Sequence, residues 1–433
     1  MTTTYDPASP RYLVESDLRE ELRRVFDICH GCRLCFNLCP SFPTLFDSVD
    51  GHDGDVGAMS DAEQDKVVEE CYQCKLCYLK CPYVPPHEWE LDFPRLMMRA
   101  HAVAQVRPGR SVKVRAADEL LGRSDLVGRV SVAAAPLVNP LIGRPGSLVR
   151  KAMGAVVGIH PERLLPPYAR ERFSTWFKRR PGGVESPRAE VSVFPTCFIE
   201  YMDPAIGKDL VAVYERNHIA CSLPAGARCC GAPWLHMGDV ARFRRVASAN
   251  VAVLAAAVRA GRDVVVAQPT CAYVVKKDYP IYAAGVDADL VAEHCFDASE
   301  YLVNEHRRDG GGLDTDFRGE RPGAIAYHLS CHYRALGIGA KGRDLLQLAG
   351  AEVRVVERCS GIDGTWGYRS EHYDESRKVA RPLVRELGAT GATAVCGDCH
   401  LANTAILEET GIRPSHPLQI FARAYGVASP SSR

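Results

Sequence analysis

Two short cysteine-rich runs constrain this chain more than any other feature. The first is CHGCRLCFNLCP, residues 29–40, and the second is CYQCKLCYLKCP, residues 71–82. Both have the spacing C-x2-C-x2-C-x3-C-P, which concentrates eight thiols in two short segments. Ten further cysteines follow, for a total of 18 in 433 residues. The fold must therefore bring many thiols together.

The cellular compartment decides what these thiols can do. The N-terminal MTTTYDPASPRYLVESD lacks the basic region and apolar run of a signal peptide. The longest uncharged stretch, VSVAAAPLVNPLIG, has about fourteen residues, fewer than the ~18–20 needed to span a bilayer. We therefore predict a cytoplasmic protein, where thiols serve as metal ligands or redox groups rather than in disulfides. Lys plus Arg equals Asp plus Glu, at 53 each, and we expect no nucleic-acid partner.

The spacing of the two runs favours iron–sulfur clusters over zinc. Thiolates suit both, but structural zinc usually takes two separated C-x2-C pairs. The run found here is that of bacterial two-cluster ferredoxins, in which the fourth cysteine binds the other cluster. We therefore predict two [4Fe–4S] clusters, one held by Cys29, Cys32, Cys35 and Cys81 and the other by Cys71, Cys74, Cys77 and Cys39.

Helical patterns lead into each run. Residues 17–28, SDLREELRRVFD, predict a helix before Cys29, and Ser60 with Glu63 forms a capping-box pattern before Cys71. We predict an α-helical ferredoxin-type domain over residues 12–100.

The rest of the chain contains an internal repeat, in residues 191–308 and 320–427. Short β-rich runs (VSVFP and DVVVA, then AIAYHL and EVRVV) alternate with helical patterns such as 239–261 and 371–388. This alternation predicts βαβ units with a parallel sheet in each half. The cysteines follow the strands, where open α/β sheets place their ligands. The expected fold class is thus α+β multidomain, with the two halves related by a pseudo-two-fold axis around a shared cleft.

Aligning the halves pairs most of the later cysteines. Cys197 faces Cys331, Cys229 faces Cys359, and Cys230 faces Ser360. Further along, Cys271 faces Cys399 and Gln268 faces Cys396.

Taken together, these motifs resemble the iron–sulfur subunits related to heterodisulfide reductase, such as those of anaerobic glycerol-3-phosphate dehydrogenase and of glycolate and lactate oxidation systems. The resemblance also covers CSGIDGTWGYRSEHYDESRKVA and SHPLQIFARAYG. The family's repeated CCG domain carries C…C-C-G…C-x-x-C and binds a further cluster. The resemblance therefore implies one or two additional iron–sulfur clusters, with ligand sets of Cys197, Cys229, Cys230 and Cys271 in the first half and Cys331, Cys359, Cys396 and Cys399 in the second.

Both halves depart from the five-cysteine pattern of heterodisulfide reductases proper. Gln268 stands for one cysteine in the first half, and Ser360 stands for one in the second. Four thiolates suffice for a cubane, but these changes count against noncubane, disulfide-cleaving chemistry. Whether each half holds a cluster or is degenerate stays open.

Four weaker patterns have simpler explanations. CGDCH, residues 396–400, matches a haem attachment motif but is explained by the repeat, and GIGAKG, residues 337–342, is expected to turn into a helix near Lys341 rather than bind a dinucleotide. Cys221 and Cys295 are expected to be buried packing residues. His236, His328, His332 and His372 are expected to be hydrogen-bonding neighbours of the clusters rather than ligands.

The connector, residues 101–190, is basic and amphipathic. From Arg95 to Arg188 it has 18 Lys or Arg and 6 Asp or Glu. Two interpretations stay open: peripheral binding to the inner face of an anionic membrane, through residues such as Arg172, Lys178, Arg179, Arg180, Trp176 and Phe177, or packing as a linker over both domains.

No flavin or nicotinamide site is visible, and no catalytic residue is predicted. The favoured hypothesis is an iron–sulfur electron-transfer subunit of an oxidoreductase complex, which passes electrons between a flavoprotein dehydrogenase or other redox partner and a quinone or other acceptor. One alternative is a self-contained enzyme that reduces a disulfide or related substrate at the cleft of the CCG domains. Another is a non-catalytic, cluster-bearing scaffold or redox sensor.

Overall fold

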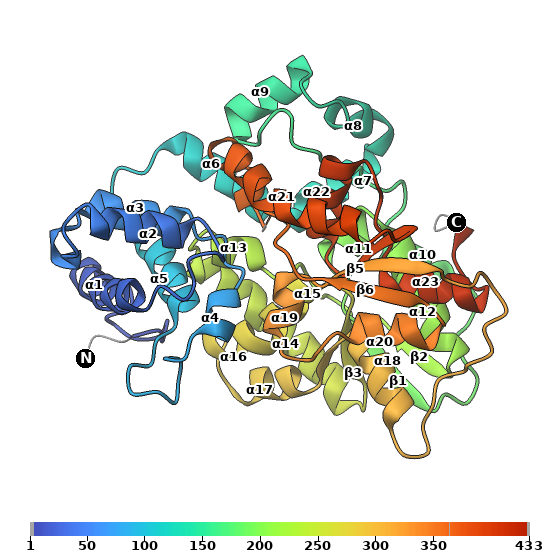
Figure 1. Cartoon of the computed structure of the whole chain (residues 1–433). Coiled ribbons are helices and arrows are strands. Elements are labelled where there is room, and N and C mark those ends of the chain that lie inside the picture. Colours follow the sequence, from blue (N-terminus) through green and yellow to red (C-terminus); the bar gives the residue numbers. More distant parts are fainter. Residues whose placement is uncertain (1–3, 363, 431–433) are drawn as a thin grey trace.

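The computed structural model describes residues 4–362 and 364–430. A helical N-terminal unit lies beside two α/β units, and a helical connector runs along the outer face of the second α/β unit (Figure 1). This order confirms the predicted succession of a helical domain and two parallel-sheet halves.

The N-terminal unit packs around one hydrophobic core. In α1, Leu18, Leu22, Val25 and Phe26 recur at helical spacing and are fully buried, which orients the end of the helix that carries Cys29. The Ser60–Glu63 capping box is present at the start of α3, as predicted. The helices are α1 (Glu15–Cys32), α2 (Ser41–Asp50), α3 (Asp61–Glu69), α4 (Leu76–Lys80) and α5 (Phe93–Val106).

The connector is helical rather than extended. Its helices are α6 (Val112–Gly122), α7 (Ser124–Ala133), α8 (Ala135–Ile142), α9 (Leu148–Val157) and α10 (Phe173–Arg179). In Figure 1, α8 and α9 lie at the top of the molecule, on the outer side of α21 and α22.

The first sheet has the parallel order β2-β1-β3-β4. Its central strands are valine-rich and buried, as expected for a parallel sheet covered by helices on both faces. The elements are β1 (Ala189–Val193), α11 (Cys197–Tyr201), α12 (Pro204–Arg216), β2 (Ile219–Ser222), α13 (Ala232–His236), α14 (Val240–Arg259), β3 (Asp263–Val266), α15 (Pro269–Tyr273), α16 (Tyr279–Tyr282), α17 (Val286–Glu293), β4 (Cys295–Asp297) and α18 (Ala298–Arg307).

The second sheet repeats this arrangement with the order β6-β5-β7. A parallel bridge between Cys396 and Ser415 occupies the place that β4 has in the first half. The elements are β5 (Ala324–His328), α19 (Cys331–Ala335), α20 (Lys341–Leu348), β6 (Glu352–Val356), α21 (Tyr373–Ala389), β7 (Ala394–Gly397), α22 (His400–Thr410) and α23 (Pro417–Tyr425). The repeat extends to its last helix, because Asp297 caps α18 as His416 caps α23, each in a capping box.

Glycines mark the same turn in both halves. Gly231 and Gly361, each just after the paired cysteine position, have φ of 89° and 69°. A Cβ on Gly231 would lie 2.9 Å from the Phe243 ring, and one on Gly361 would lie 2.0 Å from the Ser376 carbonyl oxygen. Only glycine fits such a left-handed, crowded turn.

Candidate iron–sulfur sites

The first group of thiols gathers at the end of α1. Cys29 and Cys32 end this helix, Cys35 follows in a turn, and Cys81 comes from the end of the second run. All four line one pocket. Burial and the neighbouring thiols of Cys35, Cys81 and Cys32 raise the pKa of the Cys29 thiol well above its usual value. The structure therefore brings together the four cysteines predicted for one cluster.

The second group gathers deeper in the unit. Burial and the Cys71 thiol raise the pKa of Cys39, and burial with the thiols of Cys39 and Cys71 raises the pKa of Cys77. Cys74 lies near Cys39 and Cys77 as well. The turns of the two runs match, because Arg33 and Lys75, each after a second cysteine, have φ of 50° and 64°. The fourth cysteine of each run thus lies with the first three of the other.

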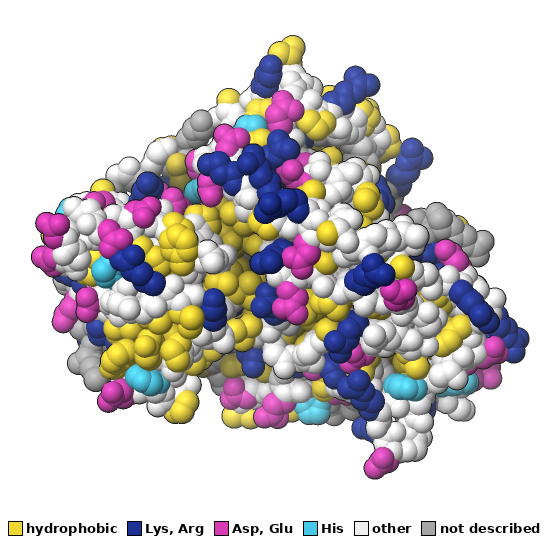
Figure 2. Space-filling model, viewed as in Figure 1, with side chains coloured by type: hydrophobic (Ala, Val, Ile, Leu, Met, Phe, Trp, Pro, Cys, Tyr) yellow, Lys and Arg dark blue, Asp and Glu magenta, His cyan; other side chains and the backbone are white. Residues whose placement is uncertain are grey.

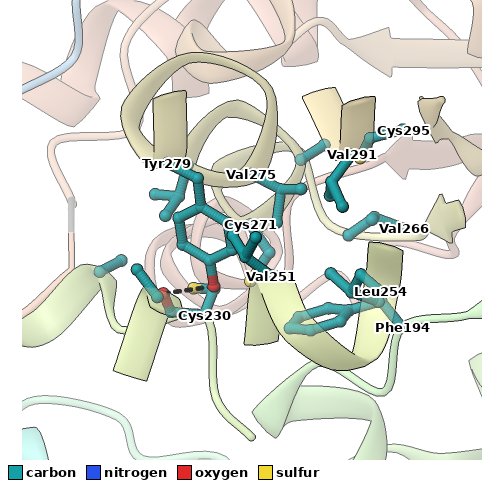
Figure 3. Close-up of a cluster of buried hydrophobic side chains, with 14 of the residues drawn as sticks. Phe194, Cys230, Val251, Leu254, Val266, Cys271, Val275, Tyr279, Val291 and Cys295 are labelled. Carbon is teal, nitrogen blue, oxygen red and sulfur yellow. Dashed lines mark hydrogen bonds between the residues drawn. The ribbon is translucent and has the colours of Figure 1, made fainter. Parts of the chain in front are cut away.

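Four thiols converge in the first half. Cys197 begins α11 after β1, Cys229 and Cys230 precede α13, and Cys271 lies in α15 after β3. Hydrogen bonds with Cys197 and Cys230 hold the pKa of the Cys229 thiol well below its usual value and raise the pKa of both partner thiols. Figure 3 shows Cys230 and Cys271 beside Tyr279, whose hydroxyl donates to the Cys230 carbonyl at 3.0 Å.

Three thiols line a pocket in the second half. Cys331 begins α19, Cys359 follows β6, and Cys399 is the N-cap of α22. Cys359 accepts a hydrogen bond from the Gly361 N–H at 3.3 Å. Ser360 and Ala402 line the same pocket.

These groupings fit iron–sulfur clusters by their chemistry. Each group consists of soft thiols, mostly buried or half-buried. Within residues 4–362 and 364–430, no group of three or more His, Cys, Asp or Glu side chains has the geometry to hold a single metal ion. A cubane is usually held by four cysteine thiolates, which three of the four groups provide.

Two family models match the chain in the order of its domains. The citrate utilization protein B Fer4-like domain matches residues 22–107, and the cysteine-rich (CCG) domain matches residues 191–276 and 325–402. A subunit of anaerobic glycerol-3-phosphate dehydrogenase from Escherichia coli (strain K12) is 30% identical over 309 residues, which span 70% of this chain and 76% of the relative.

The chain belongs to this CCG family of iron–sulfur proteins. A more distant relative is lactate utilization protein A of Bacillus pumilus, which is 25% identical over 48% of this chain and 87% of that protein. Another is a subunit of the fumarate reductase (CoM/CoB) of Methanothermobacter marburgensis, which is 24% identical over 53% of this chain and 44% of that protein. The predicted resemblance and the presence of iron–sulfur sites are thus confirmed.

Within this CCG chain, Cys396 lies apart from the second-half thiols. It sits in the middle of β7, opposite Tyr327, and is fully buried in a hydrophobic cluster with Ile325, Leu329 and Tyr333. Its predicted partners Cys331, Cys359 and Cys399 instead line the pocket at the strand ends. The structure therefore gives no support for Cys396 as a ligand.

The strand register shows which residues of the two halves correspond, and it differs from the sequence alignment at Cys396. Val193 pairs with Val265 in the first sheet, and Tyr327 pairs with Cys396 in the second. Since Val193 and Tyr327 each lie four residues before the matched Cys197 and Cys331, Cys396 corresponds to Val265. Counting on from this pair, Cys399 corresponds to Gln268, and Ala402 corresponds to Cys271. The alignment that paired Gln268 with Cys396 is shifted by three residues.

The two halves meet at these corresponding residues. The Gln268 amide donates to the Cys399 sulfur at 3.5 Å, while its carbonyl oxygen accepts the His400 N–H at 3.1 Å. Because a backbone N–H only donates, this second bond fixes which end of the amide faces the thiol. Thr270 and His332 also meet across the boundary, with Oγ1 and Nδ1 3.3 Å apart.

The ferredoxin-like domain touches the second half directly. The Tyr72 hydroxyl lies 3.4 Å from the Cys359 sulfur and donates to the Leu38 carbonyl at 3.0 Å. Cys74 packs in the same hydrophobic cluster as Cys331 and Cys359, and burial together with the Cys331 thiol raises the pKa of Cys74. The second thiol group is therefore adjacent to the pocket of the second half.

The connector contacts the first-half thiols. Sequence reasoning missed this contact. Asp125, near the start of α7, accepts the Cys229 N–H at 2.9 Å and the Tyr201 hydroxyl at 3.2 Å. Burial followed by the Cys229 charge raises the pKa of this carboxyl group. Only the separation of 104 residues along the chain hid this contact.

The expected packing residues behave differently. Cys295 is fully buried at the end of the first-half core opposite Cys230 (Figure 3), whereas Cys221 is only partly buried against another core. Two of the four histidines lie close to polar groups near the second-half thiols. His328 Nε2 is hydrogen-bonded to the Arg358 carbonyl at 2.9 Å, and His332 Nδ1 lies 3.7 Å from the Cys331 sulfur. His236 stacks on His332, and His372 stacks on Trp366. GIGAKG leads into α20 at Lys341, as predicted.

Many connector cations pair within the protein. Arg163 is buried and binds Glu408 at 2.9 Å and the Ser376 hydroxyl at 2.8 Å, which ties the connector to the second half. Arg180 pairs with Glu215, and Trp176 and Phe177 pack partly buried against the first-half core. These contacts favour the linker interpretation for α10.

Exposed apolar side chains concentrate earlier in the connector, where the space-filling view shows apolar atoms at the top of the molecule (Figure 2). Leu137, Leu148 and Val156, on α8 and α9, are 73%, 84% and 66% exposed. Of the described helices, none alone has the length and apolar character to cross a membrane, and α7 with α8 meets the criterion only as a pair bent by 108°.

Proposed function

We propose that the chain carries single electrons through two [4Fe–4S] clusters in the ferredoxin-like domain and one cluster in each CCG half. The ligands would be Cys29, Cys32, Cys35 and Cys81 for the first, Cys39, Cys71, Cys74 and Cys77 for the second, Cys197, Cys229, Cys230 and Cys271 for the third, and Cys331, Cys359 and Cys399 for the fourth. Such clusters supply one-electron transfer, with potentials set by charge, burial and hydrogen bonds to sulfur.

One observation carries this proposal. The Tyr72 hydroxyl bridges the Leu38 carbonyl and the Cys359 sulfur, and Cys74 packs beside Cys331. The protein thus supplies a short contact between the ferredoxin-type thiols and those of the second half. A chain that only displayed clusters would not need to join two domains at their thiols.

The names of the relatives support a redox partner. One relative is named as a subunit of a dehydrogenase and another as a subunit of a reductase. We propose that a flavoprotein dehydrogenase oxidises the organic substrate and that electrons leave this chain to a quinone or another acceptor. The pocket beside Cys229, lined by Arg123, Arg129, Leu126 and Trp234, offers an acceptor both cationic and apolar contacts.

The self-contained reductase fits the residues less well. Gln268, Ser360 and Ala402 stand where further cysteines would be needed to hold the noncubane clusters of disulfide cleavage. A scaffold or sensor would bind the same irons but would not pass electrons from one domain to the other.

Iron analysis and spectroscopy test the proposal. Anaerobically purified protein should contain about sixteen irons, four for each of four cubanes. Replacing Cys32 and Cys74 by Ala should abolish both ferredoxin-type reduced signals. With an artificial donor and a quinone acceptor, the wild-type chain should transfer electrons and the double variant should not. Zinc in place of iron, or transfer by the double variant, would contradict the proposal.

We also propose that α8 and α9 rest on an anionic membrane surface. Exposed Leu137, Leu148 and Val156 accompany exposed Arg144 and Lys151, a combination suited to a lipid interface. Replacing the three apolar residues by Ser should weaken binding to phosphatidylserine vesicles without loss of iron. Replacing Trp176 and Phe177 by Ser serves as the comparison, since these rings pack inward. Wild-type protein that ignores such vesicles at low salt would contradict this attachment.

A further inference from the structure

The second-half pocket offers one thiol fewer than a cubane uses. Cys331, Cys359 and Cys399 come from three separate segments and line this pocket together. A [4Fe–4S] cluster has four irons and is usually held by four cysteines. In the first half, four thiols meet that requirement.

No obvious fourth thiol exists for the second half among the described residues. Ser360 corresponds to Cys230 and Ala402 to Cys271, and both line the pocket in place of cysteines. Cys396 is fully buried in the strand core. Cys74 lies near Cys331 and Cys359 but also neighbours Cys39 and Cys77, and the described part of the chain gives the pocket no other cysteine lining.

Polar groups without protein partners border the same pocket. The Ser330 hydroxyl and His328 Nδ1 are buried and have no hydrogen-bond partner within the described residues. Buried polar atoms of this kind ordinarily bind a ligand or water. The Ser360 hydroxyl and the Thr270–His332 pair add further polar character to the lining.

We infer that the second half holds its cluster through Cys331, Cys359 and Cys399 alone, which leaves one iron open to a small anionic ligand such as a thiolate. This inference rests on the proposed function only in requiring a cluster in the second half. The first half, with four thiols, has no such open position. The chain would then combine three clusters held entirely by cysteines with a fourth that both carries electrons and binds a ligand.

Mild oxidation tests the open iron directly. Ferricyanide should remove one electron and release one ferrous ion, as [4Fe–4S]2+ becomes [3Fe–4S]+ and Fe2+. We expect wild-type protein to release about one iron per chain and to give the paramagnetic signal of a [3Fe–4S]+ cluster. Cys359→Ala should give no such signal, which assigns it to this pocket.

Variants at Ser360 and Cys396 decide the ligand set. Ser360→Cys supplies a fourth thiol and should suppress the iron release, whereas Ser360→Ala should retain it; Ala402→Cys is the second route to a fourth thiol. Cys396→Ala should release iron as the wild type does. Adding 2-mercaptoethanol should change the reduced signal of the wild type but not that of Ser360→Cys.

Three outcomes would overturn the inference: a cluster resistant to ferricyanide, loss of the second-half cluster in Cys396→Ala, or identical behaviour of Ser360→Cys and Ser360→Ala. The ferredoxin-type signals are measured in the same samples. If they persist, a failure of the inferred ligand set does not count against the proposed electron transfer.

Discussion

The two CCG halves share a backbone but differ in how their thiols lie. In the first half, the Cys229 thiol is hydrogen-bonded to those of Cys197 and Cys230, and the Cys230 thiol also to that of Cys271. In the second half, three thiols line a polar pocket next to the ferredoxin-like domain. The same sheet edge thus gathers four thiols in one half and three in the other.

The difference teaches that the position of a cysteine relative to the end of its strand, rather than motif spacing, decides whether it reaches the sheet edge. Cys396 and Cys399 are both close to the end of β7, but Cys396 lies within the strand and points into the core, while Cys399 caps the next helix. In this structure, Cys396 therefore packs in the core, away from the pocket that Cys399 lines.

The largest expected effect is a difference in iron content between the Cys229→Ala and Cys396→Ala variants. Cys229→Ala removes one of four first-half ligands and should cost that half its cluster, about four irons per chain. Cys396→Ala should keep all the iron and lower the free energy of unfolding by about 1 kcal/mol, since it only trims a buried side chain. Iron analysis and urea denaturation of both variants measure this contrast. Equal iron loss would restore Cys396 to the ligand set.

A smaller effect is expected on the reduction potential of the first-half cluster when a nearby charge is removed. Asp125 accepts the Cys229 N–H at 2.9 Å, which places its carboxylate beside this first-half thiol. Asp125→Asn keeps an oxygen for the Cys229 N–H but removes the charge, so the first-half potential should rise while that of the second half stays fixed. A redox titration followed by paramagnetic resonance measures both. A shift in the second half instead would show that the thiol groups are misassigned.

The smallest effect should come from Gln268, which corresponds to Cys399 by register and donates to its sulfur. Gln268→Leu removes an N–H···S hydrogen bond and should lower the second-half potential, because the thiolate loses a stabilising donor. Gln268→Glu should lower it further by adding charge. The first-half potential is the internal control, and an unchanged second-half potential in both variants would contradict the contact.

Local sequence patterns predicted much of the fold. The cysteine spacing placed the two runs, the capping box located α3, and the short β-rich runs located β1, β3, β5 and β6. These features depend on neighbouring residues alone. Contacts between distant segments could not be predicted in this way, because Tyr72 meets Cys359 across 287 positions and Asp125 meets Cys229 across 104.

One prediction could have been improved without a structure. In AVCGDC, residues 394–399, Cys396 lies inside the strand and Cys399 follows it at the start of a helix, so placing the strand end would have separated the two cysteines. The connector gave no such signal. Its basic composition concealed that Arg163 is buried on Glu408 while Leu137 and Leu148 are exposed.

Magnetic coupling between the ferredoxin-like domain and the second half tests the central claim most directly. In fully reduced protein, the signal from the cluster of Cys39, Cys71, Cys74 and Cys77 should be broadened by a neighbouring paramagnet, since Cys74 packs beside Cys331 and Cys359. Removing the second-half cluster with Cys359→Ala should sharpen that signal, whereas removing the first-half cluster with Cys229→Ala should change it less. If Cys359→Ala removes second-half iron yet leaves the signal unchanged, the two sites are not in electronic contact and the proposed path through Tyr72 is wrong.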